Sequence, residues 1–204
     1  MAFTNYTSFV TTVENYLARS DLNIQIPDFI TLAQHRMTRD LRVRQMLKVA
    51  TANTTAGDKN ISLPSDFLEV RDIHIDGNPV YQLEFETPDQ FFRNHKTHIS
   101  GVPTVYTILD DEFQFAPVPD GTKTVQILYY AKPTFISSTT ASNAFLANFP
   151  DALLYATLAE AEPYLMNDPR MQTWATLYDR AIVNIKANDL GSKYPNTSLN
   201  VTTR

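Results

Sequence analysis

The stretch Val125-Gln126-Ile127-Leu128-Tyr129-Tyr130 decides the fold of this chain. Successive side chains of an extended strand point to opposite faces, so Val125, Ile127 and Tyr129 lie on one face while Leu128 and Tyr130 lie on the other. A strand that is apolar on both faces has to be covered on both sides. We therefore expect a β-sandwich, or a sheet with one face packed against another part of the protein.

The strand pattern continues backwards from this stretch to Asn60. Across residues 60–131 the apolar residues favour a period of two, and clusters of Asp, Asn, Pro and Gly mark turns. A hairpin is expected between Val105 and Phe115, with its turn at Asp110-Asp111. Val70 is out of phase with Ile73, which predicts that this strand either starts near Arg71 or contains a β-bulge.

Helical spacing flanks the β region on both sides. Apolar residues recur at intervals of three and four, and Pro-Asp pairs suit the first turns of two of these helices. The expected helices span residues 4–19, 27–44, 150–166 and 169–188. Pro163 lies inside the third helix and predicts a kink or a restart there. Trp174 lies in the middle of the apolar stripe of the last helix, so it is expected in the core.

These patterns predict an α+β fold. The two helical regions are far apart in sequence and must cover each other's apolar stripes, so the N-terminal and C-terminal helices are expected to build one α-helical bundle. The β region is then an inserted, antiparallel, sandwich-like module. We assign residues 1–50 and 145–190 to the bundle, 51–144 to the β module and 191–204 to an extended C-terminal tail.

Composition narrows the class of protein. The chain has 204 residues, 43% of them hydrophobic, no Cys, and a formal net charge of -5. A chain of this length can bury a sufficient core without a metal or a disulfide, and its net charge disfavours a general nucleic-acid binder. We find neither the pattern of a signal peptide nor an apolar run of about 18 residues, so we expect neither export by a signal peptide nor a membrane span.

The sequence offers little chemistry for catalysis or metal binding. The five glycines are scattered singly, which argues against a phosphate-binding loop. His95 and His98 have no acidic residue between them and no helical ligand spacing, so solvated loop histidines are the better interpretation. Asp110, Asp111 and Glu112 are adjacent at a hairpin tip, where a solvated turn is preferred over an acid and base pair. We predict no enzyme activity, no cofactor and no metal.

Basic residues concentrate around the end of the second expected helix. Five of the 17 Lys and Arg residues fall in this one stretch: Arg36, Arg39, Arg42, Arg44 and Lys48. One interpretation is a solvated helix end, where cations are favourable. The other is a docking surface for an acidic partner or for passing DNA, and it makes the four arginines candidate partner-binding residues.

The last residues of the chain combine scattered apolar side chains with polar Ser, Asn and Thr. They carry too little apolar surface to fold alone, so we expect a tail. Either this tail is merely a frayed terminus, or it anchors in a groove or at a sheet edge of a partner. The anchoring interpretation gives partner-binding roles to Tyr194, Pro195, Leu199 and Val201.

Several short segments occur in a characteristic order along nearly the whole chain. They are Leu63-Pro64-Ser65-Asp66-Phe67-Leu68-Glu69, Ser100-Gly101-Val102-Pro103 followed by Tyr106, Pro117-Val118-Pro119, Tyr129-Tyr130, Leu158-Ala159-Glu160-Ala161 and Tyr164-Leu165-Met166-Asn167-Asp168. Through this order and spacing the chain resembles the head-to-tail adaptor (connector) proteins of short-tailed bacteriophages. Phe145 stands where such proteins are expected to have Trp, which is a conservative departure.

The resemblance implies a structural virion protein with a helical bundle that carries a β-rich insertion. Such adaptors form a dodecameric ring that is seated under the portal protein and above the tail nozzle or tail-tube protein. Genomic DNA would pass through the ring without sequence-specific binding. The implied location is the head-tail interface of the virion, and the host cytoplasm during assembly, with no membrane involved. The family has no catalytic residues to assign here.

Alternatives to this function belong to the same and to other classes. Another phage neck or tail-tube component is the nearest alternative. A carbohydrate-binding β module would show a pocket walled by aromatic side chains, whereas an adaptor would show flat interfaces. A glycosidase or peptidase that acts on the cell envelope is disfavoured because no catalytic constellation is recognisable in the sequence.

Overall fold

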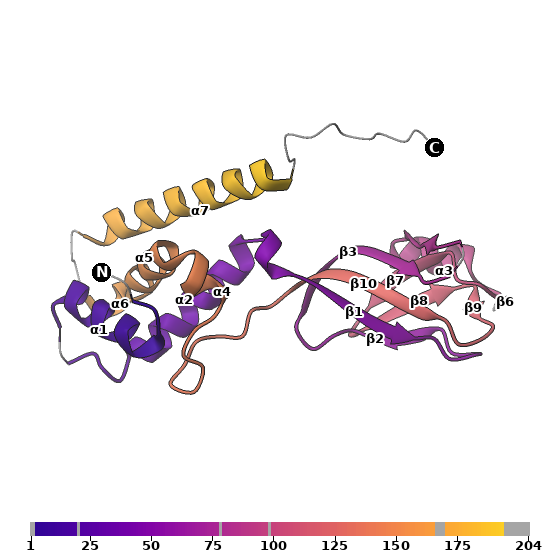
Figure 1. Ribbon diagram of the computed structural model, residues 1–204, viewed down its shortest axis with the longest axis horizontal. Helices are drawn as coiled ribbons and strands as arrows, with labels where there is room; N and C mark the ends of the chain where they lie inside the picture. The colour runs from indigo at the N-terminus through magenta and orange to yellow at the C-terminus, as the bar shows by residue number, and fades with distance from the viewer. Residues whose placement is uncertain (1–2, 20, 78, 98, 166–169, 194–204) are drawn as a thin grey trace. The chain divides into compact units, whose positions relative to one another are not determined.

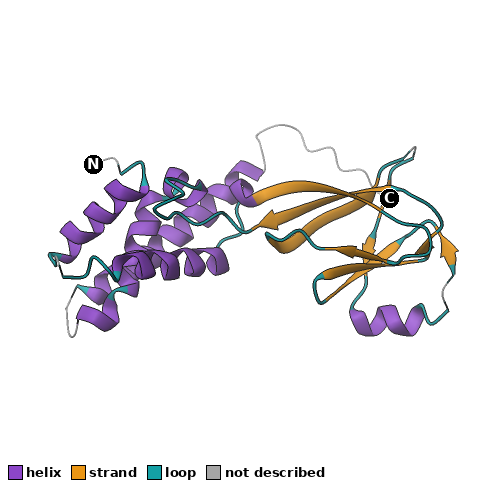
Figure 2. Cartoon of the chain, turned by 90° about the horizontal axis from the view of Figure 1, so that it is seen from below, coloured by secondary structure: helices purple, strands orange, loops and turns teal. Residues whose placement is uncertain are grey.

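The computed structural model describes residues 3–19, 21–77, 79–97, 99–165 and 170–193. Its contacts divide the chain into two compact units, residues 1–46 with 133–204 and residues 47–132. The first unit is helical and takes its residues from both ends of the chain, whereas the second contains the β-sheets (Figure 1 and Figure 2). The expectation of a fold that mixes helices with antiparallel sheets is thereby confirmed.

Helix α5 lies at the centre of the helical unit, where it packs against α1, α2, α4 and α7. Its buried side chains come from almost every side of the helix, since consecutive residues 152–154 and 156–158 are all buried. The elements of this unit are α1 (Tyr6–Leu17), α2 (Ile26–Asp40), the 3-10 turn η1 (Arg44–Met46), α4 (Ala144–Asn148), α5 (Pro150–Glu160), α6 (Glu162–Leu165) and α7 (Met171–Lys193).

Helix α2 is shorter than the sequence predicted, because it ends at Asp40 and not at Arg44. Leu41 adopts an extended conformation with φ -111° and ψ 138°. Leu41 and Val43 are both buried. Two buried residues at a spacing of two fit an extended backbone better than a helix, whose period is 3.6. Arg42 and Arg44 therefore lie beyond the helix on which they were expected.

The C-terminal helices agree with the sequence at Pro163 and differ from it at their end. Helix α5 ends at Glu160 and α6 begins at Glu162, so the predicted restart is confirmed. Helix α7 continues to Lys193, past the boundary of the expected tail at Gly191. The Asp189 carboxylate accepts a 2.8 Å hydrogen bond from the backbone N–H of Arg44, which ties the end of α7 to the unit. Trp174 is only 6% exposed, so its core position is confirmed.

The β unit contains three sheets with the strand orders β1-β10-β3-β4, β2-β8-β7-β5 and β6-β9. Its one helix among the described residues, α3, has Thr87 as its N-cap residue and a proline in its first turn. The elements are β1 (Leu47–Asn53), β2 (Asn60–Ser62), β3 (Phe67–Ile75), β4 (Tyr81–Gln82), β5 (Glu84–Phe85), α3 (Pro88–Asn94), β6 (Ser100–Gly101), β7 (Val105–Leu109), β8 (Glu112–Ala116), β9 (Val118–Pro119) and β10 (Thr124–Ala131).

Strand β10 is the central strand that the sequence indicated. It pairs antiparallel with β1 on one side and with β3 on the other. Val125, Ile127 and Tyr129 lie in one hydrophobic core together with Phe113 and Phe115 of the second four-stranded sheet. The two four-stranded sheets therefore share one hydrophobic core, to which β10 contributes from the first sheet and β8 from the second.

The pairing of β3 with β10 explains the change of phase between Val70 and Ile73. Asp72 pairs with Leu128 and Val70 pairs with Tyr129, so Arg71 is an extra residue on β3. This is a β-bulge, and the strand begins before it at Phe67. The bulge alternative is confirmed, and the alternative of a strand that starts near Arg71 is wrong.

Three features of the β unit differ from the sequence expectations. Strand β1 was not expected, and its residue Leu47 pairs with Tyr130 at the start of the unit. The unit accordingly spans 47–132 and not 51–144. Strands β5 and β7 pair in parallel, as do β6 and β9, so the module is not purely antiparallel.

None of the described helices is long and apolar enough to span a membrane.

Candidate functional site

Arg36, the first candidate partner-binding residue, is held inside the helical unit. Its guanidinium Nη1 lies 3.3 Å from Oε1 of Glu160 on α5. The same guanidinium lies over the ring of Tyr178 on α7, with 4.4 Å between Cζ and the ring centroid. Both partners are fixed by their own helices, so Arg36 connects α2 with α5 and α7. Its contacts are those of a residue that stabilises the fold.

Arg42 is also engaged with its own unit. Its Nη1 donates 2.7 Å hydrogen bonds to the carbonyl oxygens of Thr38 and Leu41. Carbonyl groups at the end of a helix have no partner within the helix, and a cation there is favourable. Arg42 thus acts as a cap for the C-terminus of α2. The sequence analysis offered a helix end at which cations are favourable as one interpretation of the basic stretch, and Arg42 fits it through these two hydrogen bonds.

Arg39 and Arg44 are exposed, which separates them from Arg36 and Arg42. The side chain of Arg44 lines a polar pocket of about 380 Å³ in the helical unit, together with Asn148, Asp151 and Asn184. The basic stretch is therefore not one uniform surface. Two of its arginines stabilise the helical unit, and two present cations to the solvent.

Lys48, which ends the basic stretch, belongs to the β unit. Its Nζ forms a 2.5 Å ion pair with Asp66, and the hydroxyl of Tyr129 donates a 2.8 Å hydrogen bond to the other oxygen of the same carboxylate. Burial on its own would raise the pKa of Asp66, but the hydrogen bonds from Lys48 and Tyr129 lower it below its ordinary value. Asp66 is therefore a fixed anion that joins β1, β10 and the start of β3.

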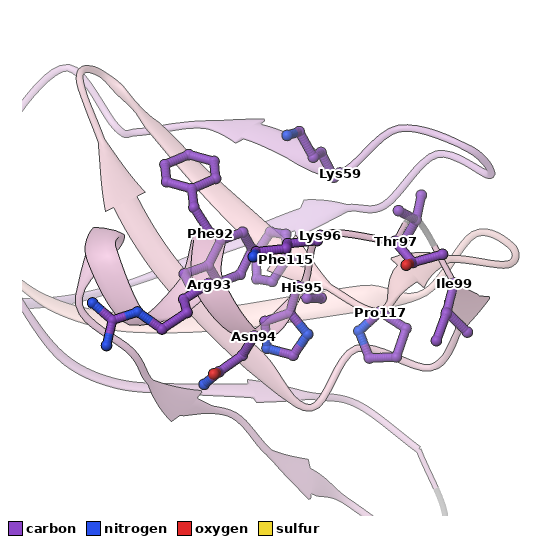
Figure 3. Close-up of a pocket in the computed structure, with 13 residues that line it drawn as sticks. Lys59, Phe92, Arg93, Asn94, His95, Lys96, Thr97, Ile99, Phe115 and Pro117 are labelled. Carbon is purple, nitrogen blue, oxygen red and sulfur yellow. The ribbon is translucent and has the colours of Figure 1, made fainter.

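A second pocket lies in the β unit and was not predicted from the sequence. It has a volume of about 460 Å³ and is bordered by α3, the loop after it and the end of β8. Its side chains include the exposed Phe92, Arg93, Lys96 and Ile99 and the half-buried Lys59 (Figure 3). Aromatic and apolar groups here alternate with cations, which suits a partner that carries both apolar and anionic groups.

A comparison with known protein families identifies the family of this chain. The sequence model of the family described as SU10 adaptor protein matches residues 4–201. The chain belongs to the SU10 adaptor protein family. The match covers both units, and it confirms the resemblance to phage head-to-tail adaptors that the ordered segments indicated. A comparison with curated proteins found no match.

As a member of this family the chain is a phage structural adaptor protein and a component of the virion. The acidic hairpin tip was weighed for catalysis and His95 for metal binding. Asp110 and Asp111 form the exposed turn between β7 and β8, as the sequence predicted. His95 Nε2 lies 3.3 Å from Glu86 and its ring packs against Phe91.

One histidine that was weighed for metal binding and the predicted anchoring residues are not covered by this geometry. His98 lies outside the described residues, and so do the four residues of the predicted anchoring tail, Tyr194, Pro195, Leu199 and Val201. Within the described ranges no group of three or more His, Cys, Asp or Glu side chains is arranged to hold a metal ion.

Proposed function

We propose that this SU10 adaptor protein forms a ring, dodecameric as the resemblance implies, that joins the portal protein to the tail nozzle or tail-tube protein at the head-tail interface. The observation that carries this proposal is the family match over residues 4–201. The ring is a structural component and not an enzyme, it requires no cofactor, and it assembles in the host cytoplasm before it becomes part of the virion.

Genomic DNA passes through the ring in this proposal. A net charge of -5 suits a channel that conducts DNA without holding it, because like charges repel and a basic lining would retain the phosphates. Recognition of base sequence plays no part in such a passage. The exposed cations Arg39 and Arg44 would then serve contacts with an acidic protein surface and not a general affinity for DNA.

Partner binding is assigned to the exposed members of the basic stretch and to the tail. Arg39 and Arg44 remain available for contacts, whereas Arg36 and Arg42 have partners within the helical unit. Tyr194, Pro195, Leu199 and Val201 supply apolar anchors to a segment that is otherwise polar. An extended segment of this composition binds best in a groove or along a sheet edge of the portal protein.

Negative-stain imaging of the purified protein mixed with its portal protein tests the proposal. The expected result is a ring stacked coaxially on one end of the portal, with a mass that gives the copy number. Rings that stack only on purified tail-tube protein would favour the alternative of another neck or tail-tube component. A protein that stays monomeric with both partners would contradict the proposed function.

A further inference from the structure

Three cationic side chains line the pocket beside α3. Lys59 precedes β2, while Arg93 and Lys96 belong to α3 and the loop after it. Among the described residues these three side chains form no ion pair; the nearby carboxylate of Glu86 is instead next to His95, at 3.3 Å. Lys59 Nζ lies 5.9 Å from the ring centroid of Phe92, which places a cation beside an exposed aromatic face.

The pocket also has an apolar part. Phe92 is 46% exposed and Ile99 is 65% exposed. A volume of about 460 Å³ lies in the range of sites that hold a small ligand or a few side chains. A matching occupant has to bring an apolar group flanked by anions.

The hairpin tip of the same unit has this composition. Asp110, Asp111 and Glu112 follow Leu109, which is 40% exposed. Asp110 has φ 55°, the left-handed conformation of a tight turn, so the tip has a defined shape before it binds anything. No ion pair involves these three acidic side chains within the described ranges.

The tip and the pocket lie at opposite ends of one strand. Glu112 begins β8, and Ala116, Pro117 and Val118 at its other end line the pocket. The strand is about 13 Å long between its first and last Cα atoms at the usual rise per residue. Two complementary surfaces at opposite ends of one element cannot meet within a single copy. They can meet between neighbouring copies, and such a head-to-tail contact closes into a ring when the rotation permits.

We propose that the pocket beside α3 binds the acidic β7–β8 hairpin tip of a second copy of this chain. Leu109 of one copy packs on Phe92 and Ile99 of the next, and the tip carboxylates face Lys59, Arg93 and Lys96. The proposal deepens the ring of the proposed function and rests on it, because it names the contact that links adjacent copies.

Cysteine cross-linking tests this contact directly, because the chain has no native Cys. The full-length variants Asp111→Cys and Lys96→Cys are mixed, allowed to assemble with the portal protein, and oxidised. The expected result is a disulfide-linked dimer from the mixture, and a ladder of higher multimers from the double variant Asp111→Cys/Lys96→Cys. The matched control replaces Lys96→Cys by Arg71→Cys, an exposed residue of β3, and should give no dimer.

Charge reversal provides the second readout. Arg93→Glu/Lys96→Glu and Asp111→Lys/Glu112→Lys should each weaken self-association at least about tenfold, because both place like charges across the contact. Mixing the two double variants should recover most of the loss. Arg71→Glu/Lys123→Glu has the same change in charge as the pocket variant and should associate like the parent protein.

The outcomes separate this contact from the ring itself. Rings that form and stack on the portal without any cross-link between Asp111→Cys and Lys96→Cys would overturn the contact and leave the proposed function standing. Cross-linked filaments without rings would support the contact and contradict the function. A pocket variant that loses binding to a fluorescent DNA duplex but assembles normally would assign the pocket to nucleic acid and overturn the proposal.

Discussion

The hydroxyl of Tyr178 donates a 2.6 Å hydrogen bond to Oδ2 of Asp40, which joins the middle of α7 to the last residue of α2. The same aromatic ring lies under the guanidinium of Arg36. Burial, and then the hydrogen bond to Asp40, raise the pKa of Tyr178 far above its ordinary value, so the phenol remains a donor. One buried tyrosine thus holds a cation and an anion of α2 in place.

Arg36 should therefore contribute to folding, unlike its neighbour Arg39. Arg36→Met loses the half-buried ion pair with Glu160 and the contact with the Tyr178 ring, and it should lower the free energy of unfolding by about 1 to 2 kcal/mol. Arg39→Met changes an exposed residue of the same helix and should cost less than about 0.5 kcal/mol. Urea unfolding followed by circular dichroism measures both. Equal losses in the two variants would contradict the structural role of Arg36.

Trp174 should be among the most important core residues of the helical unit. Trp174→Ala removes a large side chain that is 6% exposed and should cost about 3 to 5 kcal/mol. Val183→Ala on the same helix is the matched control, because Val183 is 63% exposed and should cost less than about 0.5 kcal/mol. If Trp174→Ala melts at the temperature of the parent protein, the ring contributes nothing to the core.

Local sequence signals predicted the local features well. The restart at Pro163 follows from a missing N–H group, and the bulge at Arg71 follows from a phase change between residues that are near neighbours in the chain. The hairpin turn at Asp110-Asp111 likewise depends on the residues of the turn itself. The N-cap of α1 is equally local, because the Asn5 side chain accepts a 2.9 Å hydrogen bond from the backbone N–H of Ser8.

Features that depend on residues far apart in the chain could not be predicted from the sequence. Glu160 is 124 positions from Arg36, and nothing near Arg36 indicates that it has an anionic partner. Strand β1 was missed because its hydrogen bonds are made with β10, far along the chain. The pocket beside α3 forms only when Lys59 and Phe92 are brought together by strand pairing. The sequence thus indicated that the basic residues cluster, but neither the partners of Arg36 nor the pocket beside α3 could be predicted from it.

The helical unit should fold without the β unit. Leu47 pairs with Tyr130, so the two chain ends at which the β unit begins and finishes lie side by side. Deleting residues 47–132 and joining Met46 to Pro133 through a short Gly-Ser linker should give a helical protein that melts cooperatively, as measured by circular dichroism and calorimetry. A molten or insoluble product would show that the helices need the inserted unit.

The hydrogen bond of Tyr129 to Asp66 should make the stability of the β unit depend on alkaline pH. Burial, with the hydrogen bond to Asp66 and its charge, raises the pKa of Tyr129 to about 12. The pKa of an unfolded tyrosine is about 10. Because the folded pKa is the higher one, the contribution of Tyr129 is complete below about pH 10 and is lost as the pH rises towards about 12.

Urea unfolding at several pH values between about 8 and 12 measures this loss, because this range includes the pKa of tyrosine in the unfolded and in the folded protein. Tyr129→Phe should be less stable than the parent protein at the lower pH and should show a flatter decline above about pH 10. Tyr81→Phe replaces an exposed tyrosine of β4 and should keep the slope of the parent protein. A slope in Tyr129→Phe that equals the parental one would refute the assignment.

The tail beyond α7 should be dispensable for folding and required for attachment to the portal. Helix α7 ends at Lys193, and its last turns are fixed by the bond between Asp189 and the N–H of Arg44. Truncation after Lys193 leaves this bond in place, so the free energy of unfolding should change by less than about 0.5 kcal/mol.

Binding should respond differently, because an extended segment gains its free energy only from the contacts that a partner supplies. The truncated protein should co-sediment with purified portal protein much more weakly than the full chain does. The triple variant Tyr194→Ser/Leu199→Ser/Val201→Ser keeps the length of the tail and removes its apolar anchors, so it should bind as weakly as the truncation. A variant whose tail has the same composition in scrambled order is the control for non-specific hydrophobic binding, and it should also bind the portal protein weakly. Infectious particles completed at normal yield by the truncated protein would refute the anchoring role of Tyr194, Pro195, Leu199 and Val201.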